Sequence, residues 1–171
     1  MEDAAITAKP NIDWKAAIWA GIIGGIVFMV LEMAMVAIFL GKSPWGPPHM
    51  IAAIVLGKSV LPMPGGPPPM LTGTVLLSAM LVHFVLSIIF AFILAWVITG
   101  RTYSTAVGIG AVFGVLLYLV NFYILTGIFP WFAMARTWVT IFTHISFGIA
   151  AAISYMSLSG RAAPPQRTQM G

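Results

Sequence analysis

The sequence predicts an all-α membrane protein, a bundle of four transmembrane helices, and three observations lead to that prediction. The 171-residue chain is 60% hydrophobic and only 7% charged, whereas a soluble domain carries about 25% charged residues. Four apolar segments each reach the ~20 residues that a helix needs to cross a bilayer. The few polar residues inside these segments recur at helical spacing, so they mark the faces that should meet inside the bundle.

The four expected spans follow one another with polar or proline-rich breaks between them. Residues 1–15 are polar and charged and predict an N-terminal segment outside the bilayer, and residues 159–171 predict a polar C-terminal tail. The transmembrane domain lies between them, at residues 16–158. Its spans are expected at 16–40, 71–99, 106–128 and 131–158.

A proline-rich insertion separates the first two spans. Eight of the 12 prolines lie between Pro44 and Pro69, where they remove backbone donors and stiffen the chain. Within the insertion, about residues 46–70, the apolar stretch 49–56 is too short to span a bilayer. It predicts a short helix at the outer interface, and this loop is the expected docking place for a partner protein.

An even number of spans places both termini on one side of the membrane. Five basic residues lie on that side and three on the other, which favours cytoplasmic termini by the positive-inside rule. The five are Lys9, Lys15, Arg101, Arg161 and Arg167, and the three are Lys42, Lys58 and Arg136. These scattered charges do not suggest a nucleic-acid partner. The absence of cysteine excludes disulfides, thiolate metal sites and iron–sulfur clusters.

The two halves of the chain resemble each other. At an offset of 86 residues, the helix ending G-x-x-P-W at Trp45 recurs at Trp131. At an offset of 61 residues, His83 matches His144. The sequence therefore predicts a tandem repeat of two helical hairpins, related by an axis along the membrane normal.

Ionisable and polar side chains gather at similar depth inside the expected spans. His83 and His144 lie near the middle of the second and fourth spans, and Glu32, Tyr118 and Asn121 complete an expected buried polar cluster. A charged side chain at the bilayer centre costs about 2.5–3.5 kcal/mol or more. Such residues are therefore functional-site hypotheses by default.

One hypothesis is a b-type haem. Two imidazoles from different helices at equal depth are a standard axial pair for haem iron, so His83 and His144 are the expected metal ligands. Arg136, with Lys42, is expected to bind the propionates. The small residues expected beside the macrocycle are Ser87, Gly110, Gly114 and Gly148.

Three other interpretations stay open. A proton or ion path could use Glu32 and the buried histidines. Copper could use the three histidines and some of the 11 methionines, since Met33 and Met35 flank Glu32 and Met50 follows His49. Alternatively, the imidazoles could serve only as hydrogen-bonding links between helices.

Two stretches resemble a family of short four-helix bacterial inner-membrane proteins, some of which carry the label "sodium:proline symporter". The first combines G-K-S-P-W-G-P-P at 41–48 with I-A-A-I-V-L-G at 51–57, and the second combines N-F-Y at 121–123 with F-P-W-F-A-M-A-R at 129–136. Four spans are too few for the paired repeats and broken helices of alternating access. The resemblance implies a bacterial inner (plasma) membrane and names no catalytic residue.

The sequence contains no phosphate loop, nucleophile elbow or zinc-protease motif. We therefore expect a small non-catalytic accessory subunit of a larger inner-membrane complex, such as a respiratory or oxidoreductase complex, with b-haem ligation by His83 and His144 as one option. The alternative function is a small transporter or proton-conducting protein that uses Glu32.

Overall fold

The computed structural model describes residues 11–62 and 70–160, and within them the chain is all-helical. Four helical segments are long and apolar enough to cross a membrane, which confirms the predicted fold class and makes this a multi-pass membrane protein. They are α1 (Trp14–Leu40), α3 (Gly73–Ile98), α4 with its extension (Tyr103–Gly127) and α5 (Trp138–Ser159). The apolar residues on their outer surfaces indicate contact with lipid.

Each long helix begins at a side-chain cap. In all four, the capping oxygen accepts a hydrogen bond from the backbone N–H three residues later, which satisfies one of the free donors of the first turn. The caps are Asp13, Thr72, Thr102 and Thr137. These caps place the helix starts at residues 14, 73, 103 and 138. The first three lie within about three residues of the starts that hydropathy predicted, and the fourth does not.

The fourth span differs most from its predicted bounds. Residues Pro130–Ala135 form a separate 3₁₀ helix, η4, and α5 begins only at Trp138. Pro130 starts the 3₁₀ turn, and the extended backbone at Thr137 separates it from α5. The predicted start of the span at residue 131 is therefore wrong. Trp131 is instead buried, and its indole N–H donates to the Met50 carbonyl at 3.0 Å.

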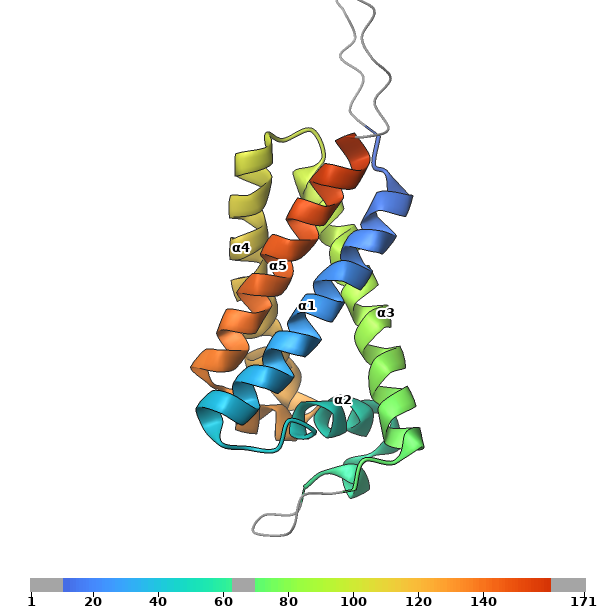
Figure 1. Ribbon diagram of the computed structural model, residues 1–171, viewed down its shortest axis with the longest axis vertical. Helices are drawn as coiled ribbons and strands as arrows, with labels where there is room; N and C mark the ends of the chain where they lie inside the picture. Colours follow the sequence, from blue (N-terminus) through green and yellow to red (C-terminus); the bar gives the residue numbers. More distant parts are fainter. Residues whose placement is uncertain (1–10, 63–69, 161–171) are drawn as a thin grey trace, which may run out of the picture.

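The proline-rich insertion contains the expected short helix, α2 (Gly46–Leu56), followed by a 3₁₀ turn, η1 (Lys58–Val60). Pro47 and Pro48 lie in the first turn of α2, where the missing N–H groups cost nothing. Figure 1 shows α2 lying across the end of the bundle and packing against α3. The insertion is therefore a folded cap that covers one end of the helices.

We name the two ends of the bundle by what lies there. The terminal end holds Trp14, the α3–α4 connection and Ser159, and the cap end holds α2 and η4 (Figure 1). Both ends of the described chain lie at the terminal end. The polar N-terminal segment and C-terminal tail fall mostly on residues 1–10 and 161–171, outside the described residues.

The helices are not related by a complete two-fold symmetry. Helix α5 packs against both α4 and α1, and α1 also packs against α3, whereas α3 and α4 have few contacts. In a symmetric pair of hairpins, the α3–α4 contact would match the α1–α5 contact. Helix α2 has no counterpart in the second hairpin, and it packs against α3.

Within each hairpin, however, the packing does repeat. In α1, Gly21 and Gly25 both lie against Ser87, and in α4, Gly110 and Gly114 both lie against Gly148. Ser87 follows His83 by four positions, and Gly148 follows His144 by four positions. Glycines at this spacing let helix backbones approach closely. This packing matches Gly21 with Gly110, so the two hairpins are offset by 89 residues in the structure. The offset predicted from the sequence is 86 residues, and the difference of three residues is close to one helical turn.

Candidate functional site

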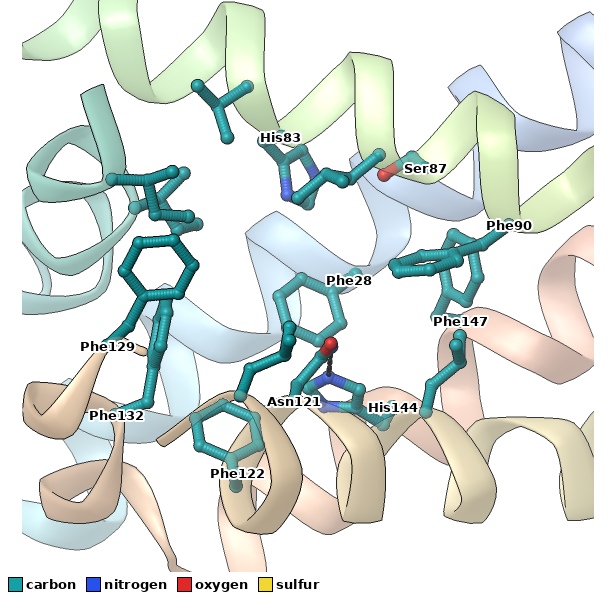
Figure 2. A pocket seen from close by; sticks show the side chains of 16 residues that line it. Phe28, His83, Ser87, Phe90, Asn121, Phe122, Phe129, Phe132, His144 and Phe147 are labelled. Carbon is teal, nitrogen blue, oxygen red and sulfur yellow. Dashed lines mark hydrogen bonds between the residues drawn. The ribbon is translucent and has the colours of Figure 1, made fainter. Parts of the chain in front are cut away.

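A cavity of about 240 Å³ lies between α3 and the α4–α5 pair in the cap half of the bundle. Residues of α2 and η4 line its cap side, and Phe28 of α1 lines its floor. Its wall is mainly apolar, and six phenylalanines dominate it (Figure 2). They are Phe28, Phe90, Phe122, Phe129, Phe132 and Phe147. The polar side chains in the wall are His83, Ser87, Asn121 and His144.

His144 is buried in α5 and both of its ring nitrogens are hydrogen bonded. Nδ1 lies 2.7 Å from the Thr140 carbonyl oxygen, and Nε2 lies 3.2 Å from the Asn121 amide nitrogen. A carbonyl oxygen only accepts, so Nδ1 carries the proton and Nε2 accepts from Asn121. Three aromatic rings also contact the imidazole, those of Phe28, Tyr118 and Phe122. His144 is therefore held in one orientation from several sides.

His83 has fewer contacts on the opposite wall. Its Nε2 lies 2.9 Å from the Gly25 carbonyl oxygen and must donate to it. Nδ1 is then an unprotonated acceptor, and it has no hydrogen-bond partner among the described residues. The two histidines predicted to act together thus line one cavity, but only His83 has a ring nitrogen free.

Phe28 lies between the two histidines (Figure 2). Its ring centroid is 5.6 Å from that of His83 and 4.8 Å from that of His144. A haem held by both imidazoles would need Phe28 to leave this space and His144 to give up one of its hydrogen bonds. Haem ligation stays a prediction, and these two changes are what it requires.

Asn121 reaches the cavity because the end of α4 changes its winding. After α4 ends at Leu119, a single π-helical segment, η2, covers Val120–Ile124. Such segments are rare and frequently occur at functional sites. This winding directs Asn121 and Phe122 into the cavity wall. Asn121 donates to His144 through its amide, so the Asn121 carbonyl oxygen is left without a partner among the described residues.

Arg136 holds the π-helical segment from outside the cavity. Its Nε donates to the Phe122 carbonyl at 2.7 Å, and another guanidinium nitrogen donates to the Thr126 hydroxyl at 3.1 Å. The guanidinium carbon also lies 4.4 Å from the ring centroid of Tyr123. Arg136 was predicted to bind haem propionates. In this structure its contacts stabilise the backbone that carries Asn121.

Glu32 is buried, with 4% of its surface exposed, and its partners in the described part of the chain are hydroxyl groups. The Thr140 hydroxyl donates to Oε1 at 3.1 Å and the Thr143 hydroxyl donates to Oε2 at 2.6 Å. The Thr140 carbonyl also accepts from His144. Glu32, Thr140, His144 and Asn121 therefore form one connected chain of hydrogen bonds.

The expected polar cluster is thus partly assembled. Tyr118 joins it through ring contacts with His144 and Phe122.

A second cavity of about 300 Å³ lies between α1, α2 and α3, and Glu32, His83 and Phe28 are among its lining residues. The two cavities therefore share Phe28 and His83 as wall residues.

Sequence reasoning missed several residues of the site. Thr143 is fully buried against Glu32, and its spacing of three residues from Thr140 could have revealed it. Phe129 and Phe132 reach the cavity only because η4 folds back, which no local pattern signals. His49, which the copper interpretation named, is buried but lines neither cavity. Its Nδ1 donates to the Trp45 carbonyl, and its Nε2 has no partner among the described residues.

Comparisons with models of known families, with curated proteins and with solved structures found no match for this chain. Within the described residues, no group of three or more histidine, aspartate or glutamate side chains could hold a metal ion.

Proposed function

We propose that this membrane protein binds a lipid-soluble small molecule in the aromatic cavity between α3 and the α4–α5 pair. The observation that supports the proposal is a mostly apolar cavity whose wall contains polar atoms without partners. Ligand sites are typically apolar pockets with a few convergent polar groups. These atoms are open to the cavity rather than enclosed by protein. The hydrocarbon region of a bilayer supplies no water to bond them, so they favour a ligand that completes them.

The size of the cavity favours a ligand with one ring. An apolar protein cavity of ~150 Å³ can hold benzene, and this cavity measures about 240 Å³. A single substituted ring therefore suits the space, and any longer apolar tail would have to extend out of it. Because α3 and α4 have few contacts, their interface offers a route for such a tail into lipid.

The test is whether a cavity-filling substitution removes a bound compound. Leu86 lines the cavity and is 38% exposed, so an indole at this position can occupy the cavity without displacing the core. Leu81 on the same helix is 68% exposed and lies outside the cavity wall, so Leu81→Trp is a matched control. Each protein is extracted in mild detergent, and the small molecules that co-purify are identified by mass spectrometry.

We expect a compound that accompanies the wild type and Leu81→Trp but is depleted at least tenfold in Leu86→Trp. An identical set of co-purifying compounds in all three proteins would contradict the proposal. Mass spectrometry of the extract detects the compound whatever its chemical class.

Membership of a larger membrane complex is a second proposal. It is supported by large apolar side chains that are exposed on the segments of the cap end, outside the four spans. These are Trp45, Val55, Met70, Ile128 and Met134. Exposed apolar surface of this kind marks a protein or membrane contact. Co-migration with a larger complex after mild extraction tests this role.

A further inference from the structure

The free atoms of the cavity wall differ in what they can offer a ligand. The Gly25 carbonyl fixes the proton of His83 on Nε2, so Nδ1 can only accept a hydrogen bond. In the same way, the Thr140 carbonyl fixes the proton of His144 on Nδ1, so Asn121 must present its amide N–H to Nε2. The Asn121 carbonyl oxygen is then the free end of that side chain, and it also can only accept.

Ser87 is the third polar group of the wall with no hydrogen-bond partner among the described residues. It is buried, lines the cavity and follows His83 by four residues in α3. Side chains at this spacing share one face of a helix, and Figure 2 shows both on the same wall. A hydroxyl group can donate and accept, so Ser87 can donate to an atom that itself donates to His83.

We infer that the ligand is a hydroquinone, which places one ring hydroxyl between His83 and Ser87 and directs the other towards Asn121. The first hydroxyl donates to His83 Nδ1 and accepts from Ser87. The second donates to the Asn121 carbonyl oxygen on the opposite wall. The phenylalanines surround the ring, and ring substituents or a tail point towards the α3–α4 interface. This inference rests on the proposed function and adds the chemistry of the ligand.

The same wall disfavours the oxidised form of that ligand. A quinone has only carbonyl acceptors at the two positions. One of them can still accept from Ser87, but the two would face the lone pairs of His83 Nδ1 and of the Asn121 oxygen. A site built to pair with a ligand hydroxyl rejects an analogue that lacks it, because the buried groups of the site stay unpaired. The cavity is therefore expected to select hydroquinones over quinones, and over hydroquinone ethers of similar shape.

The experiment measures the binding of three probes to the full-length protein in lipid nanodiscs under anaerobic conditions. The probes are trimethylhydroquinone, trimethylbenzoquinone and the dimethyl ether of trimethylhydroquinone. Partition into empty nanodiscs is subtracted from each measurement. Ser87→Ala and His83→Phe remove the two groups on the α3 wall, and Leu86→Trp blocks the cavity.

We expect the wild type to bind the hydroquinone about 3- to 10-fold more tightly than either other probe, which is the effect of about one hydrogen bond. Ser87→Ala removes a donor that an oxygen of each probe can accept from, so it should weaken the binding of all three probes and leave the preference in place. His83→Phe removes one of the two acceptors, so it should reduce the preference for the hydroquinone. Equal binding of all three probes, blocked by Leu86→Trp, would overturn the hydroquinone inference and leave the proposed function intact. No binding above empty nanodiscs, together with no co-purifying compound that Leu86→Trp depletes, would overturn both.

Discussion

The terminal half and the cap half of this bundle are packed by different kinds of residue. In the terminal half, the buried core is rich in alanine, with Leu94, Ile98 and Tyr155 as its larger members. In the cap half, phenylalanines, two histidines and a buried glutamate surround two cavities. Small residues let helices approach until no space remains, whereas large rings fixed by their own contacts leave space between them.

This difference follows from where the chain departs from its own repeat. The glycine contacts of α1 with α3 and of α4 with α5 are alike. The insertion that forms α2 and the fold-back that forms η4 both lie at the cap end. Residues of both line the aromatic cavity. The repeat therefore builds a tight scaffold, and the irregular segments build the candidate site on it.

The largest predicted effect separates the two histidines. His144→Ala removes two hydrogen bonds and three ring contacts and leaves Asn121 unpaired, so we expect a loss of roughly 3 kcal/mol in the free energy of unfolding. His83→Ala removes one hydrogen bond and two ring contacts, those with Phe28 and Phe84, and should cost roughly 2 kcal/mol. Thermal denaturation followed by tryptophan fluorescence in detergent measures both variants.

Haem ligation predicts a different pattern for the same pair. With a shared haem, both alanine variants would lose a Soret band and an α band from the reduced-minus-oxidised spectrum, and both would be destabilised to a similar extent. Unequal destabilisation with no bands in the wild type would instead support the hydrogen-bonding roles described above. One set of purified proteins provides both measurements.

A second prediction tests the tight packing of the terminal half. A Cβ atom added at Gly110 would lie 2.8 Å from the Ala152 side chain and against the Gly148 carbonyl, whereas one added at Gly108 would meet nothing within 4 Å. Gly110→Ala should therefore cost about 2 kcal/mol through overpacking. Gly108→Ala, in the same helix, should be neutral or slightly stabilising. Equal melting temperatures for the two variants would show that α4 and α5 are not in close contact.

Much of the fold could be predicted from the sequence because it depends on local patterns. The four spans follow from apolar length, α2 follows from a short apolar stretch between prolines, and the shared cavity wall of His83 and His144 follows from their equal depth. The rest depends on contacts between distant segments. Trp131 folds back to bind the Met50 carbonyl, and Phe28 enters the space between the histidines. Neither contact can be recognised from the residues that neighbour it in the sequence.

A third prediction concerns the π-helical segment that carries Asn121. Arg136→Lys keeps the positive charge but loses the planar fork that bonds the Phe122 carbonyl and the Thr126 hydroxyl. We expect a loss of about 1 kcal/mol and faster amide hydrogen exchange confined to residues 120–126. Arg101→Lys, at an exposed position on the terminal side of the bundle, is the control. Unchanged exchange in the Arg136 variant would show that the segment holds its winding without the guanidinium.

The smallest effect on stability is expected at the surface of the cap. Val55 in α2 is 59% exposed, so Val55→Lys should change the free energy of unfolding by less than about 0.5 kcal/mol. If the cap binds a larger membrane complex, the same charge should disrupt that contact, because a lysine placed in an apolar interface must lose its water. Native gel electrophoresis after mild extraction should then show less co-migration for Val55→Lys than for the wild type. Lys58→Ala, on the adjacent turn η1, is the control. Ile124→Lys is unsuitable as a control, because Ile124 lies within a membrane span. Equal migration of all three proteins would leave the cap as a cover for the cavity rather than a contact for a partner.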